Sequence, residues 1–468
     1  MQNDTAGGGA MLLAIPQTRS GGANLVKHID KPREKAVEIL HRAEEGFFAD
    51  ASLEQARQYF GARDSAFILE LVYGTLRNRS RLDWALNLLS TQPLENTDAW
   101  TRNILRMGAY QLLFLDRVPA SAAVNTATEL AKVHGKKQGY VNGLLRNLDR
   151  KRSAIAFPGT EDLVKRLAVL HSHPEWLVRR WLERYGAEIT ETLLRTNNLP
   201  APLVIRCNTL KSTRDQLHAA LASQGAESRE TFYSPAGLEI LSSPGIRALP
   251  AYEQGWFMVQ DEAAQLVSLL LAPGPGENVL DACAAPGGKA AHLDELMGDR
   301  GNIIALENDY TRIVKIRENI GRLGLKIITP EKGDATQYRE GPFDKILIDA
   351  PCSGLGVLRR HPDGRWTKNE RMIGERAAVQ KRILENCANL LKPGGVLVYS
   401  TCTTEPEENE RIINAFLASK GGDFTIDDPR SFLPVQAAAF VDDTGFFRTF
   451  PNALGMDGFF GARLVRTL

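Results

Sequence analysis

Apolar residues recur at helical spacing along the first third of the chain, from about residue 33 to residue 150. The runs 66–74 and 104–115 each place hydrophobic side chains three or four positions apart, as the buried face of a helix requires. The first run stops at Gly74 and the second breaks before Pro119, and both residue types commonly end helices. The pattern predicts an all-α bundle.

The helical pattern continues through residues 160–200 and then changes. An apolar stripe in that stretch is interpreted as core packing rather than as a stacking surface for bases, and its members are Trp176, Val178, Trp181 and Leu182. From Pro202 onward, a strand-like run at 203–207 precedes a helix at about 213–223 and short strands near 231–241. These elements predict a small α+β module.

From about residue 255, short β-rich runs alternate with longer helical runs. The predicted strands are 278–282, 302–307, 345–349 and 396–400, and the predicted helices are roughly 289–298, 309–323 and 375–391. Such alternation is typical of βαβ units, in which helices cover both faces of a parallel sheet. We therefore predict a doubly wound α/β fold that binds ligands beyond the carboxyl ends of its strands.

The length of the chain requires more than one domain. A single ordinary core does not extend over 468 residues. Residues 1–30, which contain two glycine clusters, are predicted as a flexible lead. We predict the helical bundle over 31–152, a helical linker with the α+β module over 153–254, and the α/β domain over 255–468.

Composition and charge narrow the class of protein without indicating a function. With 43% hydrophobic and 24% charged residues, and with no apolar run of membrane-spanning length, the chain is predicted to be soluble. Five scattered cysteines without a CxxC pair argue against a disulfide framework and a zinc site, and they favour the cytoplasm. Residues 33–152 carry 18 Lys and Arg against 14 Asp and Glu, a net of +4. This excess suits a polyanionic partner and ordinary surface scatter equally well.

The first predicted strand of the α/β domain opens into a glycine-containing loop ahead of a helix, namely Cys283-Ala284-Ala285-Pro286-Gly287-Gly288-Lys289. Adjacent glycines let the backbone approach a ligand closely, and the helix N-terminus offers unpaired N–H groups. Neither the GxGxxG nor the Walker phosphate-binding pattern is present.

Three acids, Glu307, Asp334 and Asp349, follow successive predicted strands. One such acid is more often a solvated turn residue, but three in series favour a ligand site. In a nucleotide-type fold, Glu307 would face a ribose and Asp334 an adenine amino group.

Two of the predicted strands lead into cysteines, at Cys352 and at Cys402. If these strands are neighbours, they lie about 4.8 Å apart and both thiols project over one crevice. Cys207 and Cys387 are interpreted as buried packing residues. The run 404–407 matches a helix capping box, so we expect a helix dipole to lower the pKa of Cys402, against the opposing effect of nearby glutamates.

Taken together, these motifs resemble one family. The segments DACAAPGGK at 281–289, DAPCSG at 349–354 and STCT at 400–403 resemble those of the RNA 5-methylcytosine methyltransferases, the Sun-domain family. The likeness is strongest to bacterial members that modify small-subunit ribosomal RNA. Residues 33–150 resemble, more loosely, the NusB-type helical RNA-binding domain. One departure is Glu307, where the family more often has aspartate.

The resemblance implies a Rossmann-like class I methyltransferase domain that uses S-adenosyl-L-methionine and no metal, with small-subunit ribosomal RNA as its partner. Cys402 would attack carbon 6 of a cytosine, and Cys352 would assist removal of the proton from carbon 5. Asp349 would hold ring nitrogen 3, with Lys289 in the same pocket. The implied cofactor contacts are the 283–289 loop, Glu307, Asp334 and Asp349. RNA binding is expected of the 153–254 module as well, and neither a membrane nor an obligate protein partner is expected.

Some alternatives stay open at this level. Three basic residues and a tryptophan after the DAPCSG motif suit phosphate contacts and base stacking as well as they suit an ordinary basic loop; they are Arg359, Arg360, Arg365 and Trp366. The same chemistry on transfer RNA or DNA is one alternative, because the motifs encode the reaction and not the target. A non-catalytic RNA-binding ribosome assembly factor is another, and the intact pair of cysteines argues against it.

Overall fold

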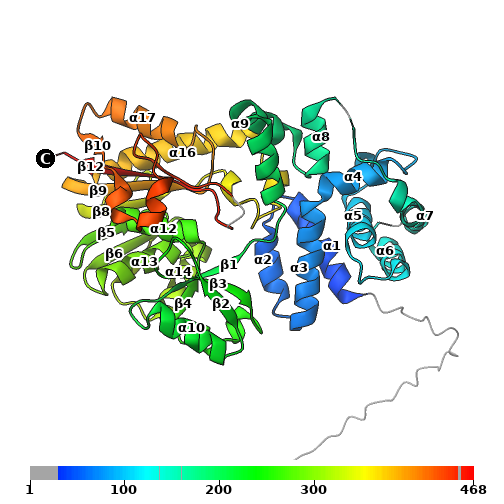
Figure 1. Ribbon diagram of the computed structural model, residues 1–468, viewed down its shortest axis with the longest axis horizontal. Coiled ribbons are helices and arrows are strands. Elements are labelled where there is room, and N and C mark those ends of the chain that lie inside the picture. The colour runs from blue at the N-terminus through cyan, green and yellow to red at the C-terminus, as the bar shows by residue number, and fades with distance from the viewer. Residues whose placement is uncertain (1–29, 136, 160, 452–454, 468) are drawn as a thin grey trace, which may run out of the picture.

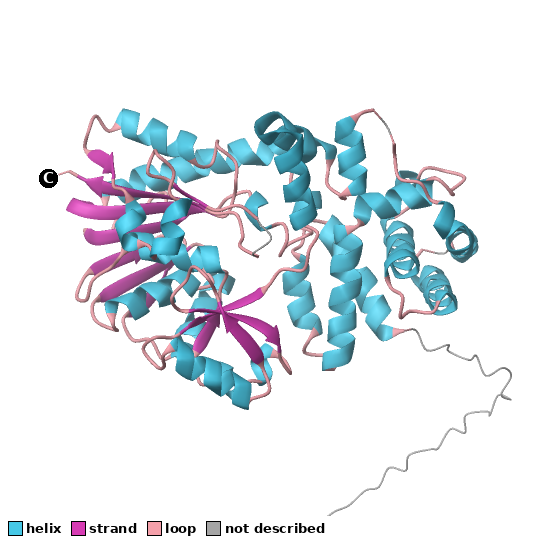
Figure 2. Cartoon of the chain, in the orientation of Figure 1, coloured by secondary structure: helices cyan, strands magenta, loops and turns pink. Residues whose placement is uncertain are grey.

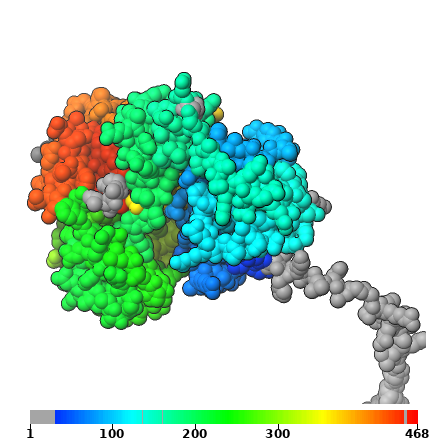
Figure 3. All heavy atoms as spheres, turned by 45° about the vertical axis from the view of Figure 1, so that its right-hand side comes forward, coloured from blue at the N-terminus to red at the C-terminus, as the bar shows by residue number. Residues whose placement is uncertain are grey.

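The computed structural model describes residues 30–467 except 136, 160 and 452–454. The predicted lead, residues 1–30, therefore lies outside the described residues apart from Asp30. Three parts follow one another along the chain: a helical bundle, a small α+β module and a large α/β domain (Figures 1 and 2). The space-filling view shows the surface hollowed between the module and the bundle (Figure 3). None of the helices within the described ranges is long and apolar enough to cross a lipid bilayer.

The N-terminal part is the predicted helical bundle. Its helices are α1 (Lys31–Glu44), α2 (Ala49–Ala56), α3 (Ala62–Arg77), α4 (Arg79–Asn87), α5 (Ala99–Phe114), α6 (Ala120–His134) and α7 (Gln138–Lys151). Helix α3 continues through Gly74, so the predicted stop at that residue is wrong. The reason for the glycine is close packing, because a β-carbon there would lie 2.0 Å from Cζ of Tyr110 on α5.

The middle of the chain contains two helices and a four-stranded antiparallel sheet. The helices are α8 (Leu163–Leu170) and α9 (Glu175–Thr196), and Val178 and Trp181 are buried, as the core interpretation expected. The strands of this sheet are β1 (Leu203–Cys207), β2 (Glu227–Glu230), β3 (Gly237–Ser242) and β4 (Phe257–Val259), and they lie in the order β2-β3-β1-β4. Two further helices, α10 (Arg214–Ser223) and α11 (Pro250–Glu253), belong to the same module. Since β4 pairs with β1, the predicted boundary at residue 254 falls inside the module.

The C-terminal part is built on an eight-stranded sheet within the described residues. Along the path β10-β12-β9-β8-β5-β6-β7, the five strands from β9 to β7 are parallel, and β12 and β10 extend the sheet antiparallel, with β11 paired to β12. The strands are β5 (Asn278–Asp281), β6 (Asn302–Glu307), β7 (Ile328–Lys332), β8 (Phe343–Asp349), β9 (Leu391–Thr401), β10 (Phe424–Ile426), β11 (Phe447–Arg448) and β12 (Phe460–Arg466). The predicted doubly wound α/β class is confirmed, and the antiparallel edge was not predicted.

Helices cover both faces of this sheet. The helices are α12 (Glu262–Leu271), α13 (Gly288–Met297), α14 (Tyr310–Leu323), α16 (Glu370–Asn389) and α17 (Glu410–Ser419). The short helix α15 (Gly364–Thr367) lies against the helical bundle instead. Consecutive strand residues point to opposite faces. On β5, accordingly, Val279 packs in the core under α12–α14, whereas Leu280 packs in the core under α16 and α17. The chain order reverses between β5 and β8, so the switch point of the sheet lies at their carboxyl ends.

Candidate active site

The two predicted thiols meet at the carboxyl ends of adjacent strands. Strands β8 and β9 pair in parallel with Asp349 opposite Ser400, and the loops that follow bring Sγ of Cys352 to 3.3 Å from Sγ of Cys402. Glu408 holds the first loop in place, because its Oε1 accepts the backbone N–H of Ser353 at 2.7 Å. The sequence-based expectation that both thiols face one crevice therefore agrees with the geometry.

The pKa values of the two thiols shift in opposite directions. A hydrogen bond from Cys352 lowers the pKa of Cys402, and Lys368 and Lys289 lower it further, while burial and Asp349 raise it. The hydrogen bond to Cys402, with burial, raises the pKa of Cys352 well above its usual value. Of the two, Cys402 is therefore the thiol that loses its proton more readily.

The predicted helix start beside Cys402 is wrong. Helix α17 begins at Glu410, and the segment 404–407 is not helical. The acid of the predicted capping box, Glu407, forms an ion pair with Arg180 of α9 instead. Its neighbour Glu405 also pairs with Arg180, and its Oε1 accepts the indole N–H of Trp181 at 3.1 Å. The lowered pKa of Cys402 therefore comes from its neighbouring side chains and not from a helix dipole.

A lysine–aspartate pair lies beside the thiols. Nζ of Lys289, on the first turn of α13, donates to Oδ2 of Asp349 at 2.6 Å, and Oγ of Ser400 donates to Oδ1 at 3.1 Å. Burial lowers the pKa of Lys289, but Asp349 outweighs burial and the net shift is upward. Lys289 is therefore a cation whose charge is offset by its partner.

Two of the three acids predicted to contact a cofactor, Glu307 and Asp334, border one pocket, whereas Asp349 does not line it. Of the predicted 283–289 loop only Cys283 lines this pocket, whose other residues include Pro351, Val379 and Ile383. Acidic side chains thus face apolar ones from α16 across a narrow space, a combination that suits a nucleoside. Glu307 is 4% exposed; it accepts the backbone N–H of Asn308 at 3.0 Å and forms a 3.1 Å ion pair with Arg312.

Asp281, at the end of β5, is a buried acid that the sequence prediction left without a role. Its side chain is fully buried, and neither carboxylate oxygen has a hydrogen-bonding side-chain partner in the described part of the chain. Burial, together with Asp349, raises its pKa to about 7. A buried carboxyl group without a side-chain partner can bind a cationic group of a ligand.

Arg206 fixes the glycine loop to the small module. Its side chain on β1 is fully buried and makes two contacts with Glu295 of α13, at 3.0 Å and 2.7 Å. Its Nη1 also donates to the carbonyl oxygen of Gly288 at 2.8 Å. The first turn of α13 therefore depends on a residue from outside the large domain.

The basic residues after the thiol loop, for which phosphate contact and an ordinary basic loop were both left open, make contacts within the protein. Arg359 and Arg365 are buried, at 5% and 0% exposure, and Arg360 pairs with Asp261 and Asp457. Trp366 is turned toward the helical bundle, where its indole N–H donates to the carbonyl oxygen of Leu76 at 2.7 Å. Neither the phosphate and stacking interpretation nor that of an ordinary solvated loop is correct, because these side chains join domains.

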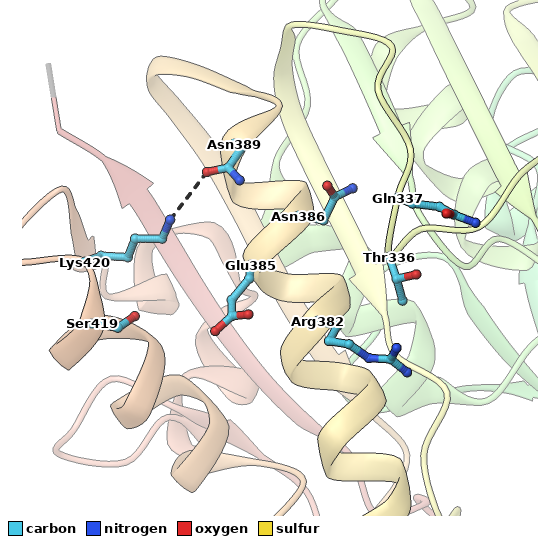
Figure 4. Close-up of a pocket in the computed structure, with 8 residues that line it drawn as sticks. All are labelled: Thr336, Gln337, Arg382, Glu385, Asn386, Asn389, Ser419 and Lys420. Atoms are coloured by element: carbon cyan, nitrogen blue, oxygen red, sulfur yellow. Dashed lines mark hydrogen bonds between the residues drawn. The ribbon is translucent and has the colours of Figure 1, made fainter.

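A larger surface pocket lies elsewhere on the domain, between α16, α17 and the loop after β7 (Figure 4). Its walls are polar, and its residues are Thr336, Gln337, Arg382, Glu385, Asn386, Asn389, Ser419 and Lys420. None of the site residues predicted from the sequence lines it. The chemistry is therefore assigned to the crevice at the strand ends.

Comparison with known families follows the same division into three parts. Residues 30–150 match the NusB family model, residues 173–247 match the RsmF/B-like ferredoxin-like domain, and residues 268–465 match the model described as 16S rRNA methyltransferase RsmB/F. Fold and site together define a class I methyltransferase. The chain belongs to the RsmB/F family of 16S rRNA methyltransferases, whose methyl donor is S-adenosylmethionine. The family predicted from the motifs is confirmed.

Known relatives are similar over most of the chain. The probable ribosomal RNA small subunit methyltransferase B of Bacillus subtilis (strain 168) is 38% identical over 405 residues, which cover 85% of this chain and 90% of that protein. The ribosomal RNA small subunit methyltransferase B of Pseudomonas syringae pv. tomato is 36% identical over 411 residues, which cover 86% of this chain and 90% of that protein. Among solved structures, the crystal structure of PH0851 is 28% identical with a TM-score of 0.77, covering 92% of this chain and 98% of that one.

Proposed function

We propose that this enzyme transfers a methyl group from S-adenosylmethionine to carbon 5 of a cytosine in small-subunit ribosomal RNA, in the cytoplasm, through a covalent adduct with Cys402. The observation that carries the proposal is the 3.3 Å pair of thiols beside the Lys289–Asp349 pair. Carbon 5 of a cytosine is a poor nucleophile until carbon 6 carries a substituent, so the reaction requires an attacking thiolate.

The cofactor supplies an electrophilic methyl group on its sulfonium. Its contacts are assigned as follows: Glu307 to the ribose, Asp334 to the adenine amino group and Asp281 to the ammonium of the methionine part. Glu307 and Asp334, which line the pocket, support this fit, and so does Asp281, which directly precedes the lining residue Ala282 and has no side-chain hydrogen-bond partner in the described part of the chain. Gly287, with a φ of +97°, lets the loop turn tightly beneath the cofactor.

The thiols then take consecutive roles. The Cys402 thiolate adds to carbon 6 of the cytosine, and Asp349 hydrogen-bonds ring nitrogen 3 as the adduct forms. Carbon 5 then takes the methyl group, and S-adenosylhomocysteine leaves. Because the hydrogen bond to Cys402 is the main cause of the high pKa of Cys352, consuming the Cys402 thiolate removes that cause, and Cys352 can lose its own proton to water. The Cys352 thiolate removes the proton from carbon 5, the bond between carbon 6 and sulfur breaks, and Cys402 leaves as a thiolate. The target base must be flipped out or single-stranded to enter.

Replacing Cys352 by alanine should trap the enzyme on its RNA, because the adduct forms but the carbon 5 proton is not removed. With S-adenosylmethionine and small-subunit ribosomal RNA, we expect a protein–RNA complex that survives a denaturing gel. Transfer RNA in place of ribosomal RNA should give no such complex. The Cys352→Ala/Cys402→Ala double variant serves as the control and should give none with either RNA. A complex formed by the double variant, or none by Cys352→Ala, contradicts the proposed roles.

Replacing Asp281 by asparagine should weaken binding of S-adenosylmethionine, because a charge-assisted hydrogen bond to the ligand's ammonium is lost. A contribution of about 1.5–3 kcal/mol corresponds to roughly 10- to 100-fold in Kd, measurable by calorimetry. Since the pKa of Asp281 is raised to about 7, affinity in the unaltered protein should increase as pH rises through that value. Asp428→Asn, an exposed-loop control, should bind normally. Unchanged affinity in Asp281→Asn contradicts the assignment.

A further inference from the structure

Lys368 brings a second ammonium to the thiols. It follows α15, and its Nζ donates to the carbonyl oxygen of Gly354, in the loop that carries Cys352, at 3.3 Å. A β-carbon built on Gly354 would lie 3.0 Å from this Nζ and 3.9 Å from Sγ of Cys402. The ammonium and the thiol therefore flank the same glycine.

The two lysines near Cys402 differ in their partners. Lys289 is held by Asp349 at 2.6 Å, so its charge is largely offset. Among the described residues, by contrast, no carboxylate forms an ion pair with Lys368, whose only polar contact is the Gly354 carbonyl. Lys368 is partly buried, and a cation that is partly removed from water is destabilised when no anion is paired with it. The anion that would offset this cost is a thiolate on Cys402.

We propose that Lys368 is a positioning residue that keeps Cys402 in its thiolate form before the RNA base arrives. The inference rests on the proposed function in one respect only, namely that Cys402 is the nucleophile. Lys368 acts through the sulfur and is not assigned a contact with the substrate.

The charges around Cys402 support this role for Lys368. Asp349 at the end of β8 raises the pKa of Cys402, and Lys289 on α13 lowers it, so these paired neighbours oppose each other. The charge of Cys402 also contributes to the raised pKa of His361, but Nδ1 of His361 is paired with Oδ2 of Asp50 on α2 at 2.5 Å. Burial lowers the pKa of Lys368, and Cys402, Cys352, Asp363 and Glu408 oppose this shift without reversing it. In the described part of the chain, Lys368 thus has no carboxylate in an ion pair with it, and Cys402 is the first of the anionic groups that favour its charged form.

Lys368→Gln tests the inference without RNA. The rate at which iodoacetamide alkylates Cys402, read from the mass of the peptide that contains it, measures the thiolate fraction. Loss of one nearby positive charge shifts a pKa by about one unit or more, so at neutral pH we expect alkylation about tenfold slower and a pH profile moved upward. Lys368→Arg should restore much of the rate. Lys381→Gln, a matched change on the exposed side of α16, should leave the profile unchanged.

Two further measurements separate the possible causes. Binding of S-adenosylmethionine and the unfolding temperature of Lys368→Gln should match those of the unaltered protein, which shows that the variant is folded. An unmoved alkylation profile in the folded variant overturns the inference. If the proposed function fails instead, Cys402→Ala stays active in methyl transfer while the alkylation shift persists, so the two failures are distinguishable.

Discussion

Cys402→Ala should lose methyl transfer to ribosomal RNA by at least about a thousandfold, since removal of a covalent nucleophile leaves only binding and orientation. Affinity for S-adenosylmethionine should stay within about twofold, because Cys402 does not border the acid-lined pocket. Transfer of a labelled methyl group, followed by mass analysis of the nucleosides for 5-methylcytidine, measures the loss.

A matched cysteine controls for the substitution itself. Cys387 on α16 is also buried but packs in the core away from the thiols, so Cys387→Ala should keep most of the activity. Full activity in Cys402→Ala would falsify the covalent mechanism. Formation of 5-methylcytidine by Cys402→Ala at a rate about a thousandfold lower agrees with the prediction.

Arg206→Met should destabilise the protein by about 3–5 kcal/mol, because it leaves the buried carboxylate of Glu295 without its cation. Both side chains of this pair are almost fully buried, at 0% and 1% exposure. Scanning calorimetry should show a lower unfolding temperature for the transition that includes the α/β domain. Arg229→Met, which removes a solvent-exposed pair with Glu239 on the same module, should cost less than about 1 kcal/mol.

The pH dependence of this defect gives a second readout. Burial raises the pKa of Glu295, and Arg206 opposes that rise. Without Arg206 the folded-state pKa rises further above the unfolded value, so the folded state prefers the protonated acid. The stability defect of Arg206→Met should therefore be largest near pH 8 and shrink as pH falls toward 5. A defect independent of pH, or one that Glu295→Gln does not relieve, contradicts the assigned cause.

The sequence predicted four strands and three helices of the large domain, because the apolar pattern that defines them is local. The apolar runs that became β5, β6, β8 and β9 placed Asp349, Cys352 and Cys402 at strand ends, and the parallel order of the sheet then brought the two sulfurs together. Edge strand β12 was not predicted. It is also mostly apolar, but its partner β9 lies some sixty residues earlier in the chain, and such a pairing leaves no local signal.

Tertiary contacts explain the wrong predictions. The segment 404–407 has the sequence of a capping box, yet its capping acid Glu407 forms an ion pair with Arg180 of α9, as does Glu405. Local hydrogen-bonding patterns compete with such contacts and lose when a buried ion pair is available. The roles assigned to Asp281 and Lys368 depend on which neighbours each lacks, and only the folded chain shows that.

The loop after Cys352 is anchored to the helical bundle, so the bundle and the large domain are not independent modules. Trp366 donates to Leu76, the side chain of Asp363 accepts the backbone N–H of Ala49 at 3.4 Å, and Arg77 donates to the carbonyl oxygen of Arg359 at 3.4 Å. A segment that shapes the crevice is thus held by residues some three hundred positions earlier. Exchanging the bundle for that of a relative would alter turnover as well as target choice, unless the matching loop were transplanted with it.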